Sequence, residues 1–376
     1  MLRMKFFHTI TMITLAAMIS SCSNKSTVSG DCKSPEIADY PLEGGVSAPF
    51  AGFINETLIV AGGCNFPDIP AADGGKKAYY DKSYALNLNE LKWKEQTPLN
   101  TPTAYGATAQ TPYGLACIGG QSATSSLSES FLIKLDENKG VTIIDTLPQL
   151  PISIDNGGAA YLKGKIIVTG GNQSDGGKGL YALDMNNPNQ WEKLSDYPGP
   201  IRVQPVIISD EESLYIAGGF QLDAESKRCT LSTNLLKYSL SEDQWTELTE
   251  LPMDNSGTPC CLVGGSGVYV NGCLVMTGGV NYNIFKEAVE GRGPDDYMTK
   301  PREWYKFNKD ILIYNLKTGK WQTVPDVSGM DKAGGVLVCH EGNLYMVCGE
   351  IKPGIRTQEI CSFLKLNEMI SQGHHL

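Results

Sequence analysis

The stretch "LIVAGG" at 58–63 runs an apolar strand into a pair of glycines, and this pattern recurs along the chain. The other copies are "LACIGG" (115–120), "IIVTGG" (166–171), "LYIAGG" (214–219), "LVMTGG" (274–279) and "LYMVCGE" (344–350). Successive copies lie roughly 50 to 70 residues apart, a period typical of four-stranded propeller blades. Glycine lets backbones approach closely near a crowded axis. The six copies therefore predict an all-β fold, a six-bladed propeller.

Each copy continues in the same way, which strengthens that prediction. After the glycine pair come a loop and a further strand, as in "YALNL" (84–88), "YALDM" (181–185) and "LIYNL" (312–316). A turn and then often a tryptophan come next, at Trp93, Trp191, Trp245 and Trp321, before a segment that contains proline. This pattern resembles Kelch repeats and covers nearly the whole chain after the N-terminal region.

The last copy lacks an outer strand because the chain ends soon after it. The N-terminal "SPEIADYPL" (34–42) ends like "KLSDYP" (193–198), which closes an earlier repeat. We therefore expect residues 36–40 to pair with 363–366 and to close the ring, which removes exposed sheet edges. The propeller is then expected over 34–370, with a tail at 371–376.

The N-terminus has the features of an export signal. Arg3 and Lys5 precede a short apolar run, and small residues lead to Cys22. This arrangement predicts a signal peptide at 1–21, too short for a membrane span. A cysteine at the cut resembles a bacterial lipobox, so Cys22 is expected to carry lipid, with 22–33 as a linker and the cell envelope or periplasm as the location. The alternative is an ordinary signal peptide with an incidental cysteine.

Composition narrows the classes of partner. The formal net charge is −10 and no basic cluster occurs, so nucleic acid is not expected as a partner. Contact with a membrane is expected only through the lipid anchor. No C-x-x-C spacing appears among the 11 cysteines, so a zinc site is unsupported. Export permits disulfides, but most cysteines lie in apolar runs and are expected to be small buried hydrophobic residues.

Propeller topology predicts which loops meet. Strands in a blade alternate in direction, so the loops after the glycine pairs and the connections between blades emerge on one face. The post-glycine loops supply Asn65, Phe66, Gln121, Asn172, Gln173, Gln221, Asn281, Asn283, Phe285, Glu350 and Arg356, and the connections supply Tyr105, Asp155, Asn156, Arg202, Gln204 and Asp254. Amides and aromatics with few charges suit a neutral polyol with one anionic group, held at a concave site around the channel.

One of these loops carries a more specific resemblance. "CGEIKPGIRT" (348–357) is similar to a segment of the Kelch mutarotases, the N-acetylneuraminate epimerases that act on sialic acid. "GGVNYNIF" (278–285), "YKFNKDIL" (305–312), "GFINETLIVAGG" (52–63) and the "AYG" at 104–106 resemble further segments of that family. The order of the segments is rotated along the chain, as in a circularly permuted branch, which a ring tolerates because only the closing point moves.

The resemblance implies an isomerase that interconverts α and β anomers by opening and reclosing the sugar ring. Glu350 takes the position of the family's proposed catalytic glutamate, and general acid–base catalysis by a carboxylate contributes about 10²- to 10⁴-fold. Arg356 takes the position of the catalytic arginine; a guanidinium binds a carboxylate bidentately, so it either holds the substrate or tunes Glu350. Arg202, Gln204, Asn65, Phe66, Tyr105, Asn281, Asn283 and Phe285 are the expected substrate-binding residues. The reaction requires no cofactor, and no motif indicates a cofactor or a metal.

Structural interpretations exist for the same residues. Glu350 and Arg356 also fit an ion pair that merely orders a loop, and Arg202 fits a structural role as well as a ligand role. Asn281, Asn283 and Phe285 also fit residues that order a long insertion from 280 to 308, whose "EGRGPDDYMTKPREW" portion suits a solvated excursion. Lys76 and Lys77 are expected on a solvated loop.

Three other functions fit a propeller of this kind. Copper radical oxidases need histidine ligands, and the one internal histidine, His340, is expected on the opposite face. A sialidase would be expected to show repeated Asp-box motifs and an arginine triad, and no Asp boxes occur in the sequence. Glycosidases generally use two carboxylates, and as a partner for Glu350 only Asp155 and Asp254 are available by position. The third is a non-catalytic Kelch propeller that binds glycan or protein at the cell envelope, since fold does not imply function.

Overall fold

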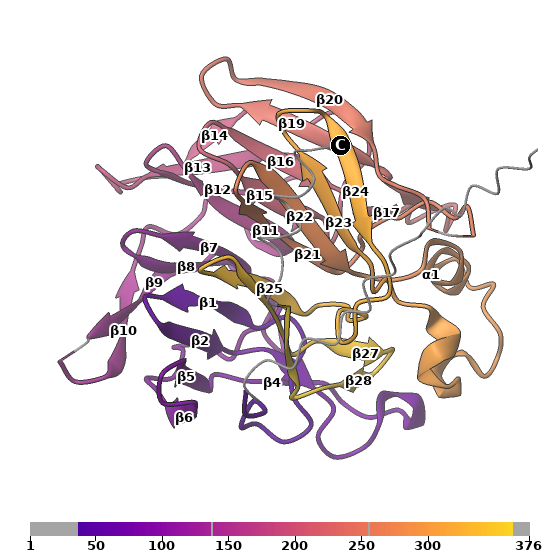
Figure 1. Ribbon diagram of the computed structural model, residues 1–376, viewed down its shortest axis with the longest axis horizontal. Coiled ribbons are helices and arrows are strands. Elements are labelled where there is room, and N and C mark those ends of the chain that lie inside the picture. The colour runs from indigo at the N-terminus through magenta and orange to yellow at the C-terminus, as the bar shows by residue number, and fades with distance from the viewer. Residues whose placement is uncertain (1–36, 137, 255, 364–376) are drawn as a thin grey trace, which may run out of the picture. The chain divides into compact units, whose positions relative to one another are not determined.

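The computed structural model describes residues 37–136, 138–254 and 256–363, and these form a six-bladed Kelch-type β-propeller (Figure 1). Five blades are four-stranded antiparallel sheets, and the described part of the last has three strands. The first three blades are β1 (Phe50–Ile54), β2 (Thr57–Ala61), β5 (Ser83–Asn87) and β6 (Lys92–Glu95); β7 (Ala107–Thr111), β8 (Gly114–Ile118), β9 (Ser130–Asp136) and β10 (Val141–Thr146); and β11 (Ile154–Leu162), β12 (Lys165–Gln173), β13 (Leu180–Asp184) and β14 (Glu192–Leu194). The last three are β15 (Val206–Ser209), β16 (Ser213–Ala217), β19 (Asn234–Ser239) and β20 (Gln244–Glu250); β21 (Gly265–Val270), β22 (Cys273–Gly278), β23 (Ile311–Asn315) and β24 (Lys320–Val324); and β25 (Val336–His340), β26 (Asn343–Val347) and β29 (Ile360–Phe363). The prediction of six blades is confirmed.

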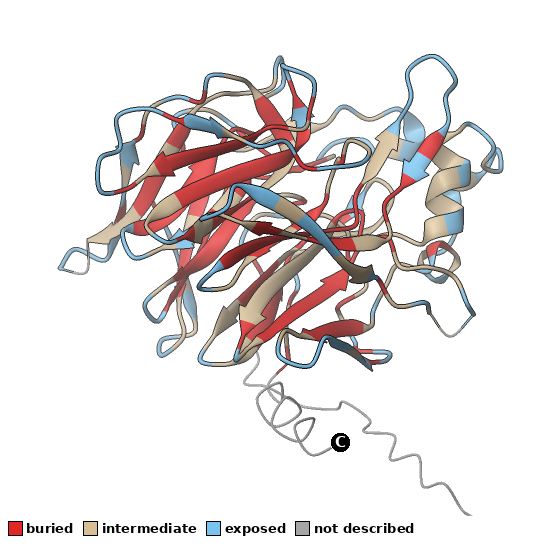
Figure 2. Cartoon of the chain, turned by 90° about the horizontal axis from the view of Figure 1, so that it is seen from above, coloured by how far each residue is buried: buried red, intermediate tan, exposed pale blue. Residues whose placement is uncertain are grey.

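The core is divided among the interfaces between blades. Six buried apolar clusters each combine side chains from two neighbouring blades, including one that joins the sixth blade to the first. The second strand of each blade is buried almost throughout, which explains why these strands read as unbroken apolar runs (Figure 2). The blades are therefore held by face-to-face packing of sheets around the axis.

The glycine pairs end the second strands in a left-handed backbone turn. The first residue of each pair has a positive φ, 65° at Gly218, where an added Cβ would lie 2.0 Å from the carbonyl oxygen of Cys261. The second residue donates its amide proton to the connection that precedes the next blade, as Gly219 N–H does to Cys261 O at 3.0 Å. In the sixth blade Cys348 takes the first position with φ 52°, and Gly349 N–H donates to Val46 O at 2.9 Å. The unusual "CGE" copy thus keeps the turn of the other five.

A closed ring of six backbone hydrogen bonds surrounds the axis. Each blade contributes one residue near the start of its first strand, and each amide donates to the carbonyl of the preceding member at 2.6 to 3.2 Å. All six have a positive φ between 52° and 71°. The members of this axial ring are Ala48, Tyr105, Asn156, Gln204, Gly264 and Gly334.

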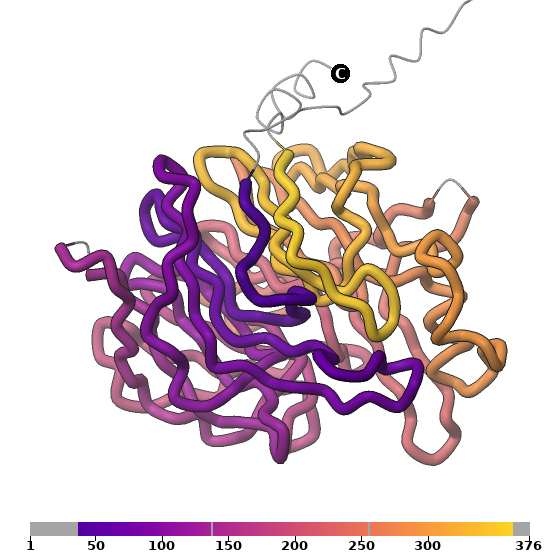
Figure 3. Tube along the Cα trace, turned by 90° about the horizontal axis from the view of Figure 1, so that it is seen from below, coloured from indigo at the N-terminus to yellow at the C-terminus, as the bar shows by residue number. Residues whose placement is uncertain are grey.

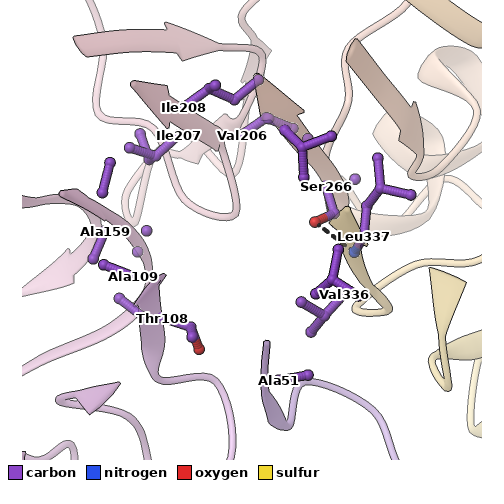
Figure 4. A pocket seen from close by; sticks show the side chains of 18 of the residues that line it. Ala51, Thr108, Ala109, Ala159, Val206, Ile207, Ile208, Ser266, Val336 and Leu337 are labelled. Carbon is purple, nitrogen blue, oxygen red and sulfur yellow. Dashed lines mark hydrogen bonds between the residues drawn. The ribbon is translucent and has the colours of Figure 1, made fainter. Parts of the chain in front are cut away.

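The axial ring separates two cavities. On one side a cavity of about 560 Å³ lies between the first strands of all six blades. Its wall consists of small and branched side chains, among them Ala109 of β7, Val206 of β15 and Leu337 of β25, whose amide donates to Ser266 Oγ at 2.9 Å (Figure 4). On the other side of the ring lies a second cavity, which is the candidate site described below. Ser47 and Ala333, each directly before a member of the ring, are part of its lining.

The N-terminal segment lies beside the last blade, at the point where the ring closes (Figure 3). Tyr40 N–H donates to Gln358 O at 2.8 Å, and Tyr40 packs edge-on against Trp93, as Tyr197 packs against Trp245. The Trp93 indole donates to Ala38 O at 2.9 Å, as the other outer-strand tryptophans donate to the end of the preceding blade.

These contacts put residues 37–42 in the place of a closing segment of the sixth blade, although no strand is assigned there. The expected pairing of 36–40 with 363–366 falls mostly outside the described residues and stays a prediction. The expected signal peptide at 1–21, lipidated Cys22, the linker at 22–33 and the tail at 371–376 also lie outside them.

Short strands and helical segments lie on the face that carries the post-glycine loops. They form three hairpins, β3 (Cys64–Asn65) with β4 (Ala78–Tyr79), β17 (Phe220–Leu222) with β18 (Cys229–Leu231), and β27 (Glu350–Lys352) with β28 (Ile355–Arg356). The helical turns are η1 (Ala71–Asp73), α1 (Tyr282–Val289), η2 (Tyr297–Thr299) and η3 (Arg302–Tyr305), the last three within the insertion of the fifth blade. No helix in the described ranges has the length and apolar character needed to span a membrane.

Candidate active site

The β27–β28 hairpin follows Gly349 and places Glu350 opposite Arg356. The hairpin turns at Pro353 and Gly354, and Gly354 has φ 81°, as the third position of a type II turn requires. Glu350 and Ala333 exchange both backbone hydrogen bonds at 2.7 and 2.9 Å, and Ala333 directly precedes a member of the axial ring. A residue immediately after a glycine pair therefore lies next to the axis, which explains why a carboxylate at this position belongs to the site.

Glu350 and Arg356 form an ion pair that leaves part of the guanidinium unsatisfied. Arg356 Nη2 lies 2.8 Å from Glu350 Oε2, and the two side chains are 4% and 22% exposed. Arg356 Nε and Nη1 are buried and have no hydrogen-bond partner among the described residues. The Phe66 ring covers the guanidinium, with its centroid 4.8 Å from Cζ. Because an unpaired buried N–H is costly, these groups are ready to bind an anion that enters the cavity.

Burial raises the pKa of the Glu350 carboxyl above its usual value. Arg356, Lys77 and the Gly354 amide oppose that shift because each stabilises the carboxylate. A carboxyl with a raised pKa is a better proton acceptor once it is ionised. The environment of Glu350 thus suits a general base.

Lys77 and Tyr105 supply a second polar group in the same cavity. Lys77 Nζ donates to Tyr105 Oη at 2.8 Å, and the thiol of Cys64, at 3.4 Å, donates to the same oxygen. Burial, with a smaller contribution from the neighbouring Cys64, raises the pKa of Tyr105 far above its usual value, so this phenol stays protonated. Lys77 was expected on a solvated loop, and that expectation was wrong: the β3–β4 hairpin returns the chain so that Lys77 faces the cavity, whereas Lys76 is exposed.

The cavity has a volume of about 310 Å³ and combines a polar and an apolar wall. Its polar side chains are Ser47, Lys77, Tyr105, Gln204, Tyr297, Glu350 and Arg356. Its larger apolar side chains are Phe66, Val280, Phe285, Met298 and Phe307. With two cations and one carboxylate, the described lining carries one net positive charge, which favours a ligand with a single negative charge.

The insertion of the fifth blade forms part of this cavity. Phe285 of α1 packs edge-on against Phe220 at 5.1 Å, which fixes the helix on the β17–β18 hairpin. Tyr297 and Met298 of η2 reach the cavity, and Lys352 Nζ of the β27–β28 hairpin donates to Lys300 O of the insertion at 2.9 Å. The expectation of a solvated excursion holds for residues 291–296, most of which are exposed, but it was wrong for the following residues, because Tyr297 and Met298 line the site. The run "DYMTKPREWYKF" held the missed signal, since four aromatic residues are many for a solvated loop.

Four of the predicted substrate-binding residues do line the cavity, namely Gln204, Phe66, Tyr105 and Phe285. Gln204 and Tyr105 are there because both belong to the axial ring, and Gln204 Nε2 donates to Asn156 Oδ1 at 2.9 Å.

The other four predicted binding residues do not line the cavity. Arg202 is 1% exposed, and its guanidinium donates to Gly218 O, Asn234 O and Asn234 Oδ1. Asn65 donates to Gly45 O and accepts from Tyr80, so it fixes the first loop. Asn281 caps α1 by accepting from Ile284 N–H, and Asn283 is exposed on that helix. For Arg202, Asn281 and Asn283 these positions fit the structural roles considered above, and Asn65 also has a structural role.

The residues considered for the rival functions lie elsewhere. His340 ends β25, at the blade end away from Glu350, where it stacks on Phe53 and lies 2.8 Å from the Glu56 carboxylate. Asp155 accepts from Asn156 and Asn172, and Asp254 caps a turn at Ser256, so neither is a cavity-lining partner for Glu350.

Residues 147–371 match the model of the N-acetylneuraminate epimerase family, which is more than half of the chain. The chain belongs to this family. Curated N-acetylneuraminate epimerases from Salmonella enteritidis and Haemophilus influenzae are 30% and 32% identical over 227 residues, which is 57% of this chain in both cases. The match spans 57% and 58% of those two relatives.

A solved structure, that of YjhT, has the same fold. It aligns with a TM-score of 0.61 over 86% of this chain and 95% of its own, at 15% sequence identity. The membership in the family and the propeller architecture agree with the resemblance of the 348–357 segment. The rotated order of the segments along the chain stays a prediction.

Proposed function

We propose that this protein is an isomerase that interconverts the α and β anomers of N-acetylneuraminate or a closely related acidic sugar. The observation that carries the proposal is the buried Glu350–Arg356 pair, in which Arg356 keeps two unpartnered N–H groups beside a base. N-acetylneuraminate has a carboxylate on its anomeric carbon, so one group on the substrate can meet the arginine while the adjacent hydroxyl meets the glutamate. Curated epimerases at about 30% identity support the same reaction.

In this proposal Glu350 removes the proton of the anomeric hydroxyl, and the bond between the anomeric carbon and the ring oxygen breaks. Arg356 binds the substrate carboxylate through Nε and Nη1, which also holds the anomeric carbon beside Glu350. After rotation of the open chain, the ring closes on the other face of the carbonyl. The apolar wall around Phe66 and Phe285 is suited to the acyl group of an N-acetyl sugar.

The test is the rate of α-to-β conversion of freshly released N-acetylneuraminate, followed by proton NMR with and without purified protein. We expect the wild type to accelerate the conversion and Glu350→Gln to lose about 10²- to 10⁴-fold, because the amide cannot accept the proton. Glu212→Gln, at a carboxylate whose side chain is 73% exposed, is the matched control and should keep full activity.

A non-catalytic Kelch propeller that binds glycan or protein is the alternative. It predicts equal anomerisation rates with wild type, with Glu350→Gln and without protein, even if the sugar binds. That outcome would overturn the proposed function. Thermal unfolding of each variant checks that a lost rate does not come from a lost fold.

We also propose that the protein is held at the cell envelope through lipid on Cys22. This proposal rests on the sequence of the N-terminal region. Labelling of cells with a radioactive fatty acid tests it, and a Cys22→Ser variant should lose the label.

A further inference from the structure

Lys77 and Tyr105 have no role in the reaction described so far, although both line the cavity that holds Glu350 and Arg356. The Lys77 ammonium donates to the Tyr105 hydroxyl oxygen at 2.8 Å, and the Cys64 sulfur lies 3.4 Å from the same oxygen. Because an ammonium can only donate, it occupies a lone pair of the phenol oxygen and leaves the phenol its own proton to donate.

We propose that Tyr105 is the acid that protonates the sugar ring oxygen and that Lys77 is the positioning residue that replaces the Tyr105 proton. This inference rests on the proposed function and adds the acid to the base already assigned. General acid–base catalysis of ring opening needs both, because one oxygen loses a proton while the other gains one.

The proton balance of the step closes within the site. Glu350 accepts the proton of the anomeric hydroxyl, whose oxygen becomes the carbonyl. The electron pair of the breaking bond goes to the ring oxygen, which takes the Tyr105 proton, and Tyr105 takes a proton from Lys77. Glu350 and Lys77 are then both neutral, and ring closure on the other face returns both protons along the same paths.

Lys77 is needed because Tyr105 cannot stand alone as a phenolate. Burial raises the pKa of Tyr105 strongly, and the charge of Glu350 raises it further, while Arg356 opposes the shift. A phenolate in this position would be too costly to persist as an intermediate. Proton transfer from Lys77 in the same step avoids it, and the short contact between Nζ and Oη provides the path.

The backbone holds both groups in place. Tyr105 belongs to the axial ring, where its amide donates to Ala48 O at 3.0 Å and its carbonyl accepts from Asn156 N–H at 2.8 Å. Lys77 directly precedes β4, which pairs with β3 through Cys64 and Tyr79. Tyr105 therefore starts from hydrogen-bonded backbone and Lys77 from the residue next to a paired strand, which fits the precision that proton transfer requires.

The experiment compares kcat and KM for anomer interconversion in Tyr105→Phe, Lys77→Met and Lys77→Arg, with Lys76→Met as the matched control on the adjacent exposed lysine. We expect Tyr105→Phe and Lys77→Met each to lower kcat about 100-fold. Lys77→Arg keeps the positive charge and should keep KM near the wild-type value, but its kcat should stay low because a guanidinium does not release its proton. Lys76→Met should match the wild type.

The double variant Lys77→Met with Tyr105→Phe separates a shared path from two separate effects. If both residues act on one proton, its kcat should be no lower than that of either single variant. A Lys77→Arg variant with wild-type kcat, a Tyr105→Phe variant within about threefold of wild type, or multiplied losses in the double variant would overturn the inference. A wild type that does not accelerate anomerisation would instead remove the proposed function, so the two failures are distinguishable.

Discussion

Two buried arginines on the same face of this propeller differ in where their N–H groups go. Arg202, in the connection before the fourth blade, donates to the carbonyls of Gly218 and Asn234 and to the Asn234 side chain. Arg356, in the β27–β28 hairpin, contacts Glu350 through Nη2 and has Nε and Nη1 without partners among the described residues. One guanidinium stabilises the backbone around it, and the other retains hydrogen-bonding capacity beside a cavity.

The comparison teaches that burial of a charge does not by itself indicate function. Burial lowers the pKa of Arg202 to about 10, against the effects of Tyr197, Glu247 and Glu250, so it remains charged near neutral pH. Its Nη1 and Nη2 groups nevertheless donate within the fold, and its Nε, which has no partner among the described residues, belongs to a side chain that does not line the candidate cavity. A functional cation is therefore recognised by unpaired donors on a side chain that lines a cavity.

The largest expected effect is on activity at Arg356. Arg356→Met should lower kcat/KM for anomer interconversion about 100-fold or more, because the substrate carboxylate loses its bidentate partner. At neutral pH its free energy of unfolding should fall through the loss of the Nη2 contact with the buried Glu350 carboxylate, since the other two guanidinium nitrogens have no partner among the described residues to lose. NMR kinetics and urea unfolding of the same sample measure both. Unchanged activity would show that Arg356 only orders the hairpin.

Arg202 should behave in the opposite way. Arg202→Met leaves the Gly218 carbonyl and the Asn234 side chain without their donor, which should lower the free energy of unfolding by about 1–3 kcal/mol. The specific activity of the folded fraction should stay at the wild-type level. Urea unfolding gives the first quantity and NMR kinetics the second, with Arg356→Met as the comparison. A selective loss of activity without a loss of stability would return Arg202 to the site.

The architecture was predictable because one sequence motif recurs along the chain. Five glycine pairs and the Cys348–Gly349 copy imply six turns of one kind, and a ring follows from their number. The position of Glu350 was predictable for the same reason, because a residue directly after a glycine pair exchanges hydrogen bonds with the connection that leads into the axial ring. The pairing of Glu350 with Arg356 then follows from the Pro353–Gly354 turn.

The remaining site residues depend on contacts that the repeat does not encode. The connection carries Arg202 to the expected face, but the Gly218 and Asn234 acceptors of the fourth blade draw its side chain into the protein. Lys76 and Lys77 are alike in sequence, and only the short β3–β4 hairpin decides which of them faces the cavity. The insertion was predicted to be solvated because it is charged and contains Gly and Pro. Its aromatic residues are the better guide, since Tyr297 lines the cavity and Tyr305 is buried.

The smallest expected effect is a shift in the titration of Glu350 when one of its neighbours is removed. Burial already raises the pKa of this carboxyl above the usual 4.5, and Arg356 is the strongest opposing influence. Arg356→Met should therefore raise the pKa further. Glu350 would then be protonated at a higher pH than in the wild type, and residual activity, which needs the carboxylate, would fall as the pH drops through that higher value. Lys77→Met should produce a smaller shift in the same direction, because Lys77 is the next opposing influence.

Titration of ¹³C-labelled glutamate side chains by NMR measures these values, with Glu350→Gln to assign the signal. The same shift bears on stability. The folded chain holds the Glu350 proton to a higher pH than the unfolded chain does, so stability should fall as the pH rises between the usual and the raised pKa, and Glu350→Gln should remove that slope. A Glu350 signal that titrates at or below the usual value would mean that ion pairing outweighs burial, and the carboxylate would then be a weaker base than proposed.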